Sequence, residues 1–262
     1  MKNLKTRDTP LAMNGKVILI TGAGTGIGKA AALRFVAAGA QVVLAGRRHQ
    51  ELHEVAQQIS GAGGTAVAIP ADVSNEQAVC DLIAATIARF GTLDAAFNNA
   101  GILGQLKPII DLTAADFDQT IAVNTRGVWL LMREQIRAMQ QLGVQGAIVN
   151  TSSFVAAAAS AGTSVYAASK AALDSMVKAI ALEVGPHGIR VNNVAPGVIR
   201  TPMSAGIDAA GLKKFGDHAA LRRVGEPEDV ADVALWLCTQ DARFVTGQTI
   251  LVDGGFAIPG LR

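Results

Sequence analysis

The chain has 262 residues, of which 50% are hydrophobic and 17% are charged, and its formal net charge is +2. Such a composition excludes extensive disorder, and the small net charge gives no reason to expect a nucleic-acid partner. The length suits one α/β domain with a sizeable core.

The first fourteen residues are polar and mixed in charge, with no apolar run of signal-peptide length. We expect residues 1–14 to form a flexible tail and residues 15–262 to form a single domain. No run of eighteen apolar residues occurs, so we expect no membrane span and a cytoplasmic protein. Cys80 and Cys238 lie in apolar patterns that predict reduced core residues. The four histidines are scattered, and we expect no metal site.

Seven short apolar runs rich in β-branched residues predict buried strands. They lie at residues 16–20, 41–45, 65–69, 93–97, 147–150, 189–194 and 248–252. Helices are predicted between them at residues 27–38, 50–60, 75–90, 114–140, 164–184 and 227–239, whereas residues 203–223 are expected to be irregular. This alternation predicts a doubly wound, seven-stranded parallel sheet of Rossmann-like type with helices on both faces. Ligands of such sheets bind at the carboxyl ends of the strands.

Polar residues ahead of two predicted helices indicate how these helices begin. Ser74 is expected to cap the helix that ends at Phe90, with Gln77 in the capping-box position. Thr113 is expected to cap the long helix that contains Asn124. In both cases a side-chain oxygen can accept a bond from a free N–H group of the first turn.

A glycine-rich turn separates the first predicted strand from the first predicted helix. Gly22, Gly26 and Gly28 permit a tight turn, a close approach of the backbone to a pyrophosphate, and close packing of the helix on the strand. The helix N-terminus adds free N–H groups and partial positive charge. Such a sequence can also be a plain turn, but its place between a strand and a helix favours a dinucleotide site.

Tyr166 and Lys170 stand four residues apart in the predicted helix 164–184, so their side chains lie on the same face. An ammonium beside a phenol favours the phenolate and lowers the phenol pKa from its usual value of about 10. General acid–base catalysis needs a group that titrates near the working pH. The pair alone is more typical of a half-buried tyrosine with a solvated lysine one turn on, so its context decides the interpretation.

Further motifs follow the predicted strands in order along the chain. They are Thr21-Gly22-Ala23-Gly24-Thr25-Gly26-Ile27-Gly28, Asn98-Asn99-Ala100-Gly101 and Ser152-Ser153, and they precede Tyr166-Ala167-Ala168-Ser169-Lys170. Together these motifs resemble the short-chain dehydrogenase/reductase family in its single-domain form. The resemblance covers nearly the whole chain, from Gly15 to Gly255.

The resemblance implies a nicotinamide dinucleotide bound along the carboxyl ends of the strands. The cofactor contacts that it implies are Gly22, Gly24, Thr25, Gly26, Ile27, Gly28, Asp72, Val73, Asn99, Ala100, Gly101, Tyr166, Lys170, Pro196, Gly197, Ile199 and Thr201. Asp72 would contact the adenine, and Ile199 and Thr201 would face the carboxamide of the nicotinamide. For each short motif, a plain turn or a solvated side chain is the alternative.

The end of the second predicted strand bears on the choice between NAD(H) and NADP(H). It reads Ala45-Gly46-Arg47-Arg48. Gly46 stands where NAD-dependent members of the family tend to carry Asp, and an arginine can bind the 2′-phosphate of NADP(H). We therefore expect Arg47 and Arg48 to bind NADP(H), with NAD(H) as the alternative if both arginines are solvated surface charges.

The resemblance also implies the catalytic roles. Tyr166 is the general acid/base, and Lys170 lowers its pKa and binds the ribose of the nicotinamide. Ser153, thirteen residues before Tyr166, is expected to bind the substrate oxygen in preference to Ser152. Asn124 is expected to hold a water that links Lys170 to solvent.

Apolar residues near these motifs predict the wall of the substrate site. Phe154, Leu103 and Met203 are its candidate contacts beside Ser153. No Arg or Lys is placed there to bind an anion, so a neutral secondary alcohol or ketone is the expected substrate. Residues 203–223 contain three glycines and form either a lid or a surface loop.

The helices around Asn124 and Tyr166 carry apolar residues over most of their circumference, among them Val128, Leu131 and Leu173. Helices of this kind need a second partner. The family resemblance implies a homotetramer or a homodimer assembled through them.

Three functions are compatible with the sequence. The first is an NADP(H)-dependent oxidoreductase of neutral alcohols and ketones. The second is an NAD-dependent dehydrogenase of a polyol, a sugar or a dihydrodiol. The third is a non-catalytic dinucleotide-binding protein, which would have no physical need of the four residues assigned to catalysis.

Overall fold

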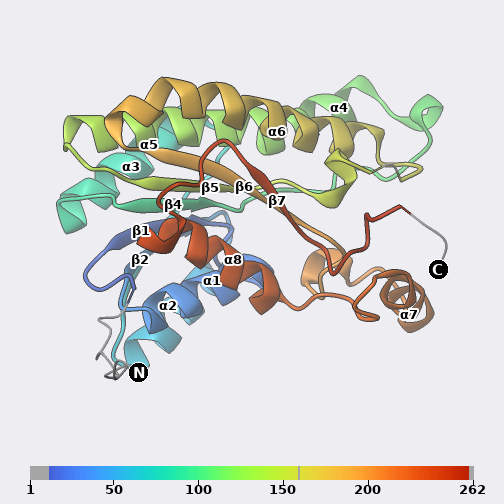
Figure 1. The fold of residues 1–262 in the computed structure, drawn as a ribbon, viewed down its shortest axis with the longest axis horizontal. Coiled ribbons are helices and arrows are strands. Elements are labelled where there is room, and N and C mark those ends of the chain that lie inside the picture. Colours follow the sequence, from blue (N-terminus) through green and yellow to red (C-terminus); the bar gives the residue numbers. More distant parts are fainter. Residues whose placement is uncertain (1–11, 159, 260–262) are drawn as a thin grey trace, which may run out of the picture.

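The seven apolar runs pair into one parallel sheet in the computed structural model, which describes residues 12–158 and 160–259. The strand order is β3-β2-β1-β4-β5-β6-β7 (Figure 1). The strands are β1 Val17–Thr21, β2 Gln41–Gly46, β3 Thr65–Pro70, β4 Ala95–Asn98, β5 Ala147–Thr151, β6 Arg190–Pro196 and β7 Thr249–Val252. The order reverses between β1 and β4, which places a ligand crevice at the carboxyl ends of these two strands. The predicted doubly wound sheet is confirmed.

Helices cover both faces of the sheet, with α1, α2 and α8 on one face and α3, α5 and α6 on the other (Figure 1). The helices are α1 Gly26–Ala37, α2 His49–Gly61, α3 Glu76–Phe90, α4 Ala114–Ile121, α5 Val128–Gln141, α6 Ser164–Val184, α7 Ala209–His218 and α8 Pro227–Cys238. In β1, Ile18 and Ile20 pack into the core under the first group of helices, and Leu19 packs under the second. A strand buried on both faces requires such a continuous apolar run.

Most predicted elements are confirmed with boundary shifts of one or two residues, and α6 has the predicted bounds. The predicted tail falls mostly outside the described residues. Its end does not behave as a tail, because Met13 is buried in the core and its N–H donates to the carbonyl of Ala38 at 2.9 Å. The folded domain therefore begins before the predicted boundary at residue 15.

The predicted cap of α3 is wrong by one residue. Asn75 is the N-cap, and its Oδ1 accepts a bond from the N–H of Ala78 at 2.9 Å. Ser74 instead donates its hydroxyl to Asp72 Oδ1 at 2.7 Å and its N–H to the same oxygen at 2.9 Å. Because the Ser74 hydroxyl bonds to the Asp72 carboxylate, Ser74 does not cap α3, and Asn75 occupies the N-cap position. The predicted cap of α4 by Thr113 is confirmed, with Asp116 completing a capping box.

The single long helix predicted for residues 114–140 is interrupted. A π-helical segment, Ala122–Gly127, separates α4 from α5. Within it, Asn124 accepts a bond from the N–H of Ile102 at 2.9 Å and donates to the carbonyl of the same residue at 2.8 Å. Because π-helical turns of this kind frequently occur at functional sites, the interruption marks the region around Asn124.

Residues 203–223 are not irregular throughout, because they contain the helix α7. Asp208 caps it through a bond from the N–H of Gly211 to Oδ1 at 2.7 Å. Two glycines in ten residues argue against a helix by propensity. Gly216 has a packing role, since a Cβ there would lie 3.3 Å from the backbone of Arg223 and Val224. Tertiary packing overrides local propensity here.

The apolar residues from which we inferred subunit contacts are mostly internal. Val128, Leu131 and Leu173 are all buried in the core that the chain itself forms under α3, α5 and α6. These three side chains therefore do not indicate subunit contacts, because the sheet and the neighbouring helices already cover them, and the homotetramer or homodimer stays a prediction. Trp129 and Leu182 are exposed on the same helices.

Both cysteines are free thiols, as predicted. Cys238 in α8 is buried, and burial raises the pKa of its thiol to about 12 although Arg190 acts in the opposite direction. Cys80 in α3 is only partly buried, so the prediction of a core position is confirmed for Cys238 alone.

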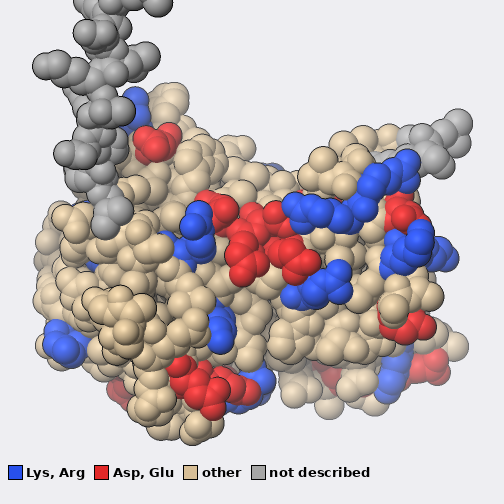
Figure 2. Space-filling model, turned by 90° about the horizontal axis from the view of Figure 1, so that it is seen from below, with Lys and Arg blue, Asp and Glu red and all other residues tan. Residues whose placement is uncertain are grey.

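The face covered by α1, α2 and α8 carries basic and acidic side chains next to one another (Figure 2). Between α1 and α8, Arg34 Nε lies 2.5 Å from Asp232 Oδ1. Exposed pairs of this kind contribute roughly 0–1 kcal/mol each, so apolar packing dominates the association of the helices with the sheet. Among the described residues, no helix has the length and apolar character needed to cross a membrane. In the same part of the chain, no three side chains from His, Cys, Asp and Glu gather into a metal site.

Candidate active site

The turn after β1 has a geometry that only glycine permits. Gly22 has a φ of +66°, and a Cβ on Gly28 would lie 2.2 Å from the Gly22 carbonyl oxygen. The turn leads directly into α1, whose first N–H groups face the carboxyl end of the sheet. The structure therefore has a tight glycine turn at the N-terminus of α1, where the sequence predicts an anion-binding site.

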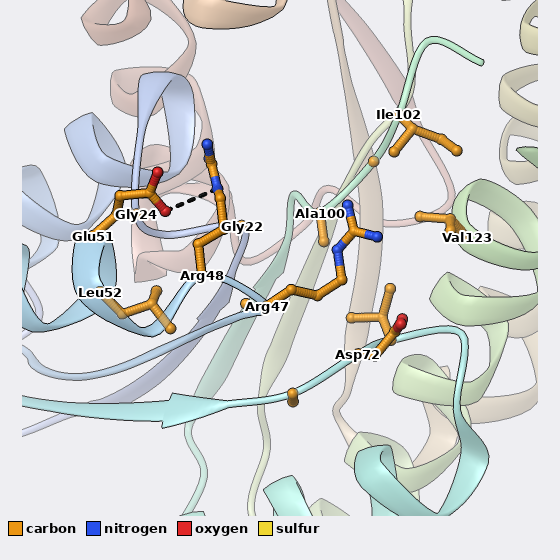
Figure 3. Close-up of a pocket in the computed structure, with 14 residues that line it drawn as sticks. Gly22, Gly24, Arg47, Arg48, Glu51, Leu52, Asp72, Ala100, Ile102 and Val123 are labelled. Atoms are coloured by element: carbon orange, nitrogen blue, oxygen red, sulfur yellow. Dashed lines mark ion pairs between the residues drawn. The ribbon is translucent and has the colours of Figure 1, made fainter. Parts of the chain in front are cut away.

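A pocket opens beside this turn, at the carboxyl ends of β1, β2, β3 and β4 (Figure 3). Its lining residues are Gly22, Gly24, Gly46, Arg47, Arg48, Glu51, Leu52, Ala71, Asp72, Val73, Ala100, Gly101, Ile102 and Val123. It thus brings together the predicted residues from the ends of four strands, β1 to β4. Glu51, Leu52, Ala71, Ile102 and Val123 are pocket residues that the sequence reasoning did not assign to the cofactor.

The two arginines after β2 lie differently in this pocket. Arg47 extends across it toward Asp72 and Ala100 (Figure 3). Arg48 turns the other way, where its Nε lies 2.8 Å from Glu51 Oε2 and its Nη2 donates to Thr25 Oγ1 at 3.0 Å. Arg48 is therefore engaged by the protein itself, whereas Arg47 presents its guanidinium to the pocket.

Asp72 keeps its negative charge at the edge of this pocket. Burial raises the pKa of its carboxyl, but the bonds from the N–H and hydroxyl of Ser74 and the charge of Arg47 outweigh burial and leave the pKa below its ordinary value. An ionised carboxylate accepts hydrogen bonds only. Asp72 is thus suited to bind a donor group such as an exocyclic amine.

The remaining predicted cofactor residues do not line this pocket, but several of them contact or belong to the glycine-rich turn beside it. They are Thr25, Gly26, Ile27, Gly28, Asn99, Tyr166, Lys170, Pro196, Gly197, Ile199 and Thr201. Asn99 Nδ2 donates to the carbonyl of Thr21 at 3.3 Å, which fixes the loop after β4 to the glycine-rich turn. A Cβ on Gly26 would lie 3.1 Å from Thr201 Cγ2, so the loop after β6 also packs on this turn.

Tyr166 and Ser153 face each other near the end of β5. Burial raises the pKa of the Tyr166 phenol above its ordinary value, although a side-chain hydrogen bond with Ser153 acts in the opposite direction. Ser152, the competing candidate, is buried, and its hydroxyl donates to the carbonyl of Lys170 at 3.4 Å. The geometry thus separates the two serines, and Ser153 is the one beside the phenol.

Lys170 is 2% exposed, and its Nζ donates to the carbonyl of Thr151 at 2.7 Å. Nζ lies 5.9 Å from the centre of the Tyr166 ring. Burial lowers the pKa of the ammonium from 10.5 to about 8, although the charge of Asp174 acts in the opposite direction. The predicted lowering of the Tyr166 pKa by Lys170 does not appear in this structure, since burial has the larger effect on the phenol.

Asn124 completes the group of buried polar residues. It is fully buried, and its bonds to the backbone of Ile102 fix the loop after β4 to the π-helical segment. A Cβ on Gly101 would lie 3.2 Å from Asn124 Oδ1 and 3.4 Å from Lys170 Nζ. Asn124 and Lys170 therefore converge on the same glycine.

A cluster of aromatic residues, Phe154, Phe215, His218 and Phe256, lies next to Ser153. The ring of Phe256 is 5.0 Å from that of Phe154, 4.6 Å from that of His218 and 6.0 Å from that of Phe215, measured between centroids. Sequence reasoning identified Phe154 as a substrate contact, but it missed Phe256 and His218. The segment after β7 carries no motif that could have indicated this contact.

Comparison with known proteins places the chain in a family. The family model described as enoyl-(acyl carrier protein) reductase matches residues 22–257. The chain is 37% identical over 247 residues to the 2,5-dichloro-2,5-cyclohexadiene-1,4-diol dehydrogenase of Sphingobium indicum, which covers 93% of this chain and 98% of that protein. The chain belongs to the short-chain dehydrogenase/reductase family.

Other short-chain dehydrogenases/reductases match this chain over a similar extent. It is 40% identical over 250 residues to the glucose 1-dehydrogenase of Gluconobacter oxydans, which covers 94% of this chain and 93% of that protein. The crystal structure of a short-chain type dehydrogenase/reductase from Mycobacterium marinum superposes with a TM-score of 0.91 at 36% identity, over 95% of this chain and 98% of that one. The protein is an NAD(P)-dependent oxidoreductase.

The short-chain dehydrogenase/reductase family implies a nicotinamide dinucleotide, and the residues present fit this group. The glycine-rich turn has no room for a Cβ at Gly28 and leaves its backbone free to approach a pyrophosphate. Small residues line the pocket where a ribose and an adenine would lie, at Gly46, Ala71 and Ala100. Arg47 supplies a positive charge within the same pocket.

Replacing the buried ammonium by an apolar side chain of similar length should change the pH dependence of stability. Below about pH 8, Lys170 is protonated in both the folded and the unfolded chain, so the cost of burying its charge is present in full. Between about pH 8 and 10.5 the folded protein loses this proton first, so the stability of the wild type should rise relative to Lys170→Met. The expected total gain is about 3 kcal/mol.

Denaturant unfolding of both proteins over this pH range measures the difference. Lys178→Met provides the matched control, because Lys178 is an exposed lysine on the same helix. A difference between wild type and Lys170→Met that stays constant from pH 7 to pH 10.5 would contradict the lowered pKa of Lys170.

Proposed function

We propose that the protein transfers a hydride between NADP(H) and a neutral secondary alcohol or ketone, with Tyr166 as the general acid/base. The observation that supports this most strongly is the placement of Tyr166 between Ser153 and Lys170 at the carboxyl end of β5. All three side chains are largely removed from water, in a site beside the dinucleotide pocket. A protein that only bound a dinucleotide would have no need of Ser153, Tyr166 and Lys170 together in one site.

Each residue has a role that follows from its surroundings. The Tyr166 hydroxyl is protonated at neutral pH and can donate to the oxygen of a carbonyl under reduction, although burial raises its pKa and by itself makes it a weaker acid. Lys170 places a positive charge one helical turn away, which stabilises the phenolate left after the proton is given up. Ser153 orients the substrate oxygen by a hydrogen bond, and Asn124 orders the polar groups behind Lys170. The bound nicotinamide supplies or accepts the hydride.

Arg47 supports a preference for NADP(H) over NAD(H). Its guanidinium lies in the pocket at the end of β2, next to Gly46 and opposite Asp72. A 2′-phosphate pairs well with a guanidinium, and such charge-assisted bonds are stronger than neutral ones. Arg48 contributes less directly, because it is paired with Glu51.

The aromatic cluster supports a flat, cyclic and neutral substrate. Phe154 follows Ser153 directly, so the face of the cluster adjoins the position of the reacting oxygen. Apolar rings bind other rings through stacked and edge-to-face contacts. The relative from Sphingobium indicum is named for a cyclohexadiene diol, which fits this chemistry. Leu103 and Met203 are proposed as further apolar contacts.

A second candidate is an NAD-dependent dehydrogenase of a dihydrodiol or a sugar. Glu51 lines the dinucleotide pocket, and an acidic side chain suits the ribose 2′-hydroxyl of NAD(H). The names of the two relatives, a diol dehydrogenase and a glucose dehydrogenase, agree with this alternative. A titration of the protein with both cofactors separates the two candidates.

The variant Tyr166→Phe should retain its fold and its cofactor affinity but lose at least about 10²-fold in turnover, a typical contribution of acid–base catalysis. Turnover follows from the absorbance of the reduced nicotinamide. Since Tyr166 is the only tyrosine in the chain, the ultraviolet absorbance of tyrosinate reports on it alone. Turnover close to that of the wild type would remove Tyr166 from the mechanism.

The variant Arg47→Ala should weaken NADPH binding about 10- to 100-fold and NADH binding much less, because it removes charge-assisted bonds to the 2′-phosphate. Fluorescence titration with each reduced cofactor measures both affinities. Arg243→Ala is a suitable control, since Arg243 is exposed and does not line the pocket. Equal losses for the two cofactors would mean that Arg47 does not distinguish them.

The variant Phe256→Ala should lower kcat/KM for a cyclic ketone about 5- to 10-fold, from the loss of about 1 kcal/mol in ring contacts. A linear ketone with the same number of carbons should be affected less. Phe244→Ala is the matched control, because Phe244 is fully exposed. Equal effects on both ketones would show that the aromatic cluster does not select ring-shaped substrates.

A further inference from the structure

Four strands carry polar side chains at the same register in the interior of the sheet. Asn98 of β4 stands beside Asn150 of β5, Asn150 beside Asn193 of β6, and Asn193 beside Thr249 of β7. The side chains bond in sequence: Asn98 Nδ2 to Asn150 Oδ1 at 2.9 Å, Asn150 Nδ2 to Asn193 Oδ1 at 3.0 Å, and Asn193 Nδ2 to Thr249 Oγ1 at 3.2 Å. We call these four residues the polar row. All three asparagines are buried.

The polar row ends on a carboxylate that comes from a helix. Asp174 of α6 accepts at Oδ1 from Asn193 Nδ2 at 3.0 Å and from Thr249 Oγ1 at 2.9 Å. A carboxylate only accepts hydrogen bonds, so Asn193 must turn its NH2 group toward Asp174 and its oxygen toward Asn150. The same reasoning then sets Asn150 and Asn98. The charge of Asp174 thus determines the direction of every amide in the row.

Asp174 also lies one helical turn after Lys170, on the same face of α6. The Lys170 ammonium is buried and donates to the carbonyl of Thr151, the residue that follows Asn150 in β5. Burial disfavours the charged form of Lys170, and the field of Asp174 favours it. The polar row is therefore linked to Lys170 through two elements. In β5, Asn150 precedes Thr151, whose carbonyl accepts a bond from Lys170, and in α6 Asp174 lies one turn after Lys170.

The other groups around Lys170 are uncharged at neutral pH. On its own helix it faces Tyr166, whose raised pKa keeps the phenol protonated. From β5 it faces the Thr151 carbonyl, and from the π-helical segment it faces Asn124 across Gly101. Asp174 is the one charged group among the described residues whose field acts on the pKa of Lys170.

We propose that Asp174 is a positioning residue of the catalytic site: anchored by Asn193 and Thr249, it keeps Lys170 in the ammonium form on which Tyr166 depends. This inference rests on the proposed roles of Tyr166 and Lys170. The inference also assigns a function to the polar row: its hydrogen bonds to Asp174 keep the carboxylate from turning toward solvent. A neutral residue at position 174 would leave the buried ammonium without a counter-charge.

The variant Asp174→Asn, which preserves size and removes the charge, tests this. The titration of Lys170 is followed by NMR of protein labelled with ¹³C at the lysine ε-carbon, and the Lys170 signal is assigned by its absence in Lys170→Met. We expect its pKa to fall by about one unit or more. The alkaline limb of the pH profile of kcat/KM should move to lower pH by the same amount, with about tenfold lower activity above it.

Further variants separate charge from packing. Glu183→Gln removes an exposed carboxylate from the same helix and should leave both the titration and the pH profile unchanged. Asp174→Glu retains the negative charge, so the alkaline limb of its pH profile of kcat/KM should stay at the wild-type position. Asp174→Ala suits a helix and provides the same test as the asparagine variant should the latter not fold.

The possible outcomes distinguish this inference from the proposed function. An unchanged Lys170 titration in a folded Asp174→Asn or Asp174→Ala protein would overturn the inference. A shifted titration with an unchanged pH profile would support the effect of Asp174 on Lys170 and contradict the proposed role of Lys170 in catalysis. Parallel shifts in both measurements would support the two together.

Discussion

The site depends on a positive charge that the fold holds out of water. Lys170 is buried at the end of β5, where its ammonium has the Thr151 carbonyl as a hydrogen-bond acceptor and Asp174 as a counter-charge. Removing a cation from water is costly unless it is paired and hydrogen-bonded. The groups around it are therefore arranged closely, with Tyr166 one turn before Lys170 on α6 and Asn124 facing it across Gly101.

A different principle governs the dinucleotide pocket. There the chain offers backbone and small residues, so that a phosphate can approach N–H groups at the start of α1. A Cβ on Gly28 would collide with the Gly22 carbonyl, so this position of the turn has no room for a side chain. Charged side chains line the pocket as well: Arg48 and Glu51 are paired with each other, whereas Arg47 extends toward Asp72 (Figure 3). The proposed preference for NADP(H) rests on Arg47 in this pocket.

Several predictions failed for a common physical reason, namely that a contact outside the predicted element changed the local preference. Ser74 has the chemistry of a cap but bonds to Asp72, so Asn75 caps α3. Val128 and Leu173 were expected to face another subunit, but the sheet covers them. The helix α7 forms despite Gly211 and Gly216. For Ser74 the competing contact is a local hydrogen bond, and in the other two cases it is packing against a neighbouring segment, which propensity and periodicity do not describe.

The sequence by itself determined the parallel sheet, the position of the glycine-rich turn and the full length of α6, because continuous apolar runs, glycine and helical periodicity act over short distances. It also brought Tyr166 and Lys170 together, since four residues make one helical turn. Only the tertiary structure decided that Arg48 pairs with Glu51 whereas Arg47 extends across the pocket, that Phe256 joins Phe154, and that Asp174 closes the polar row. These contacts join segments far apart in the chain, and their energies depend on burial that no local pattern records.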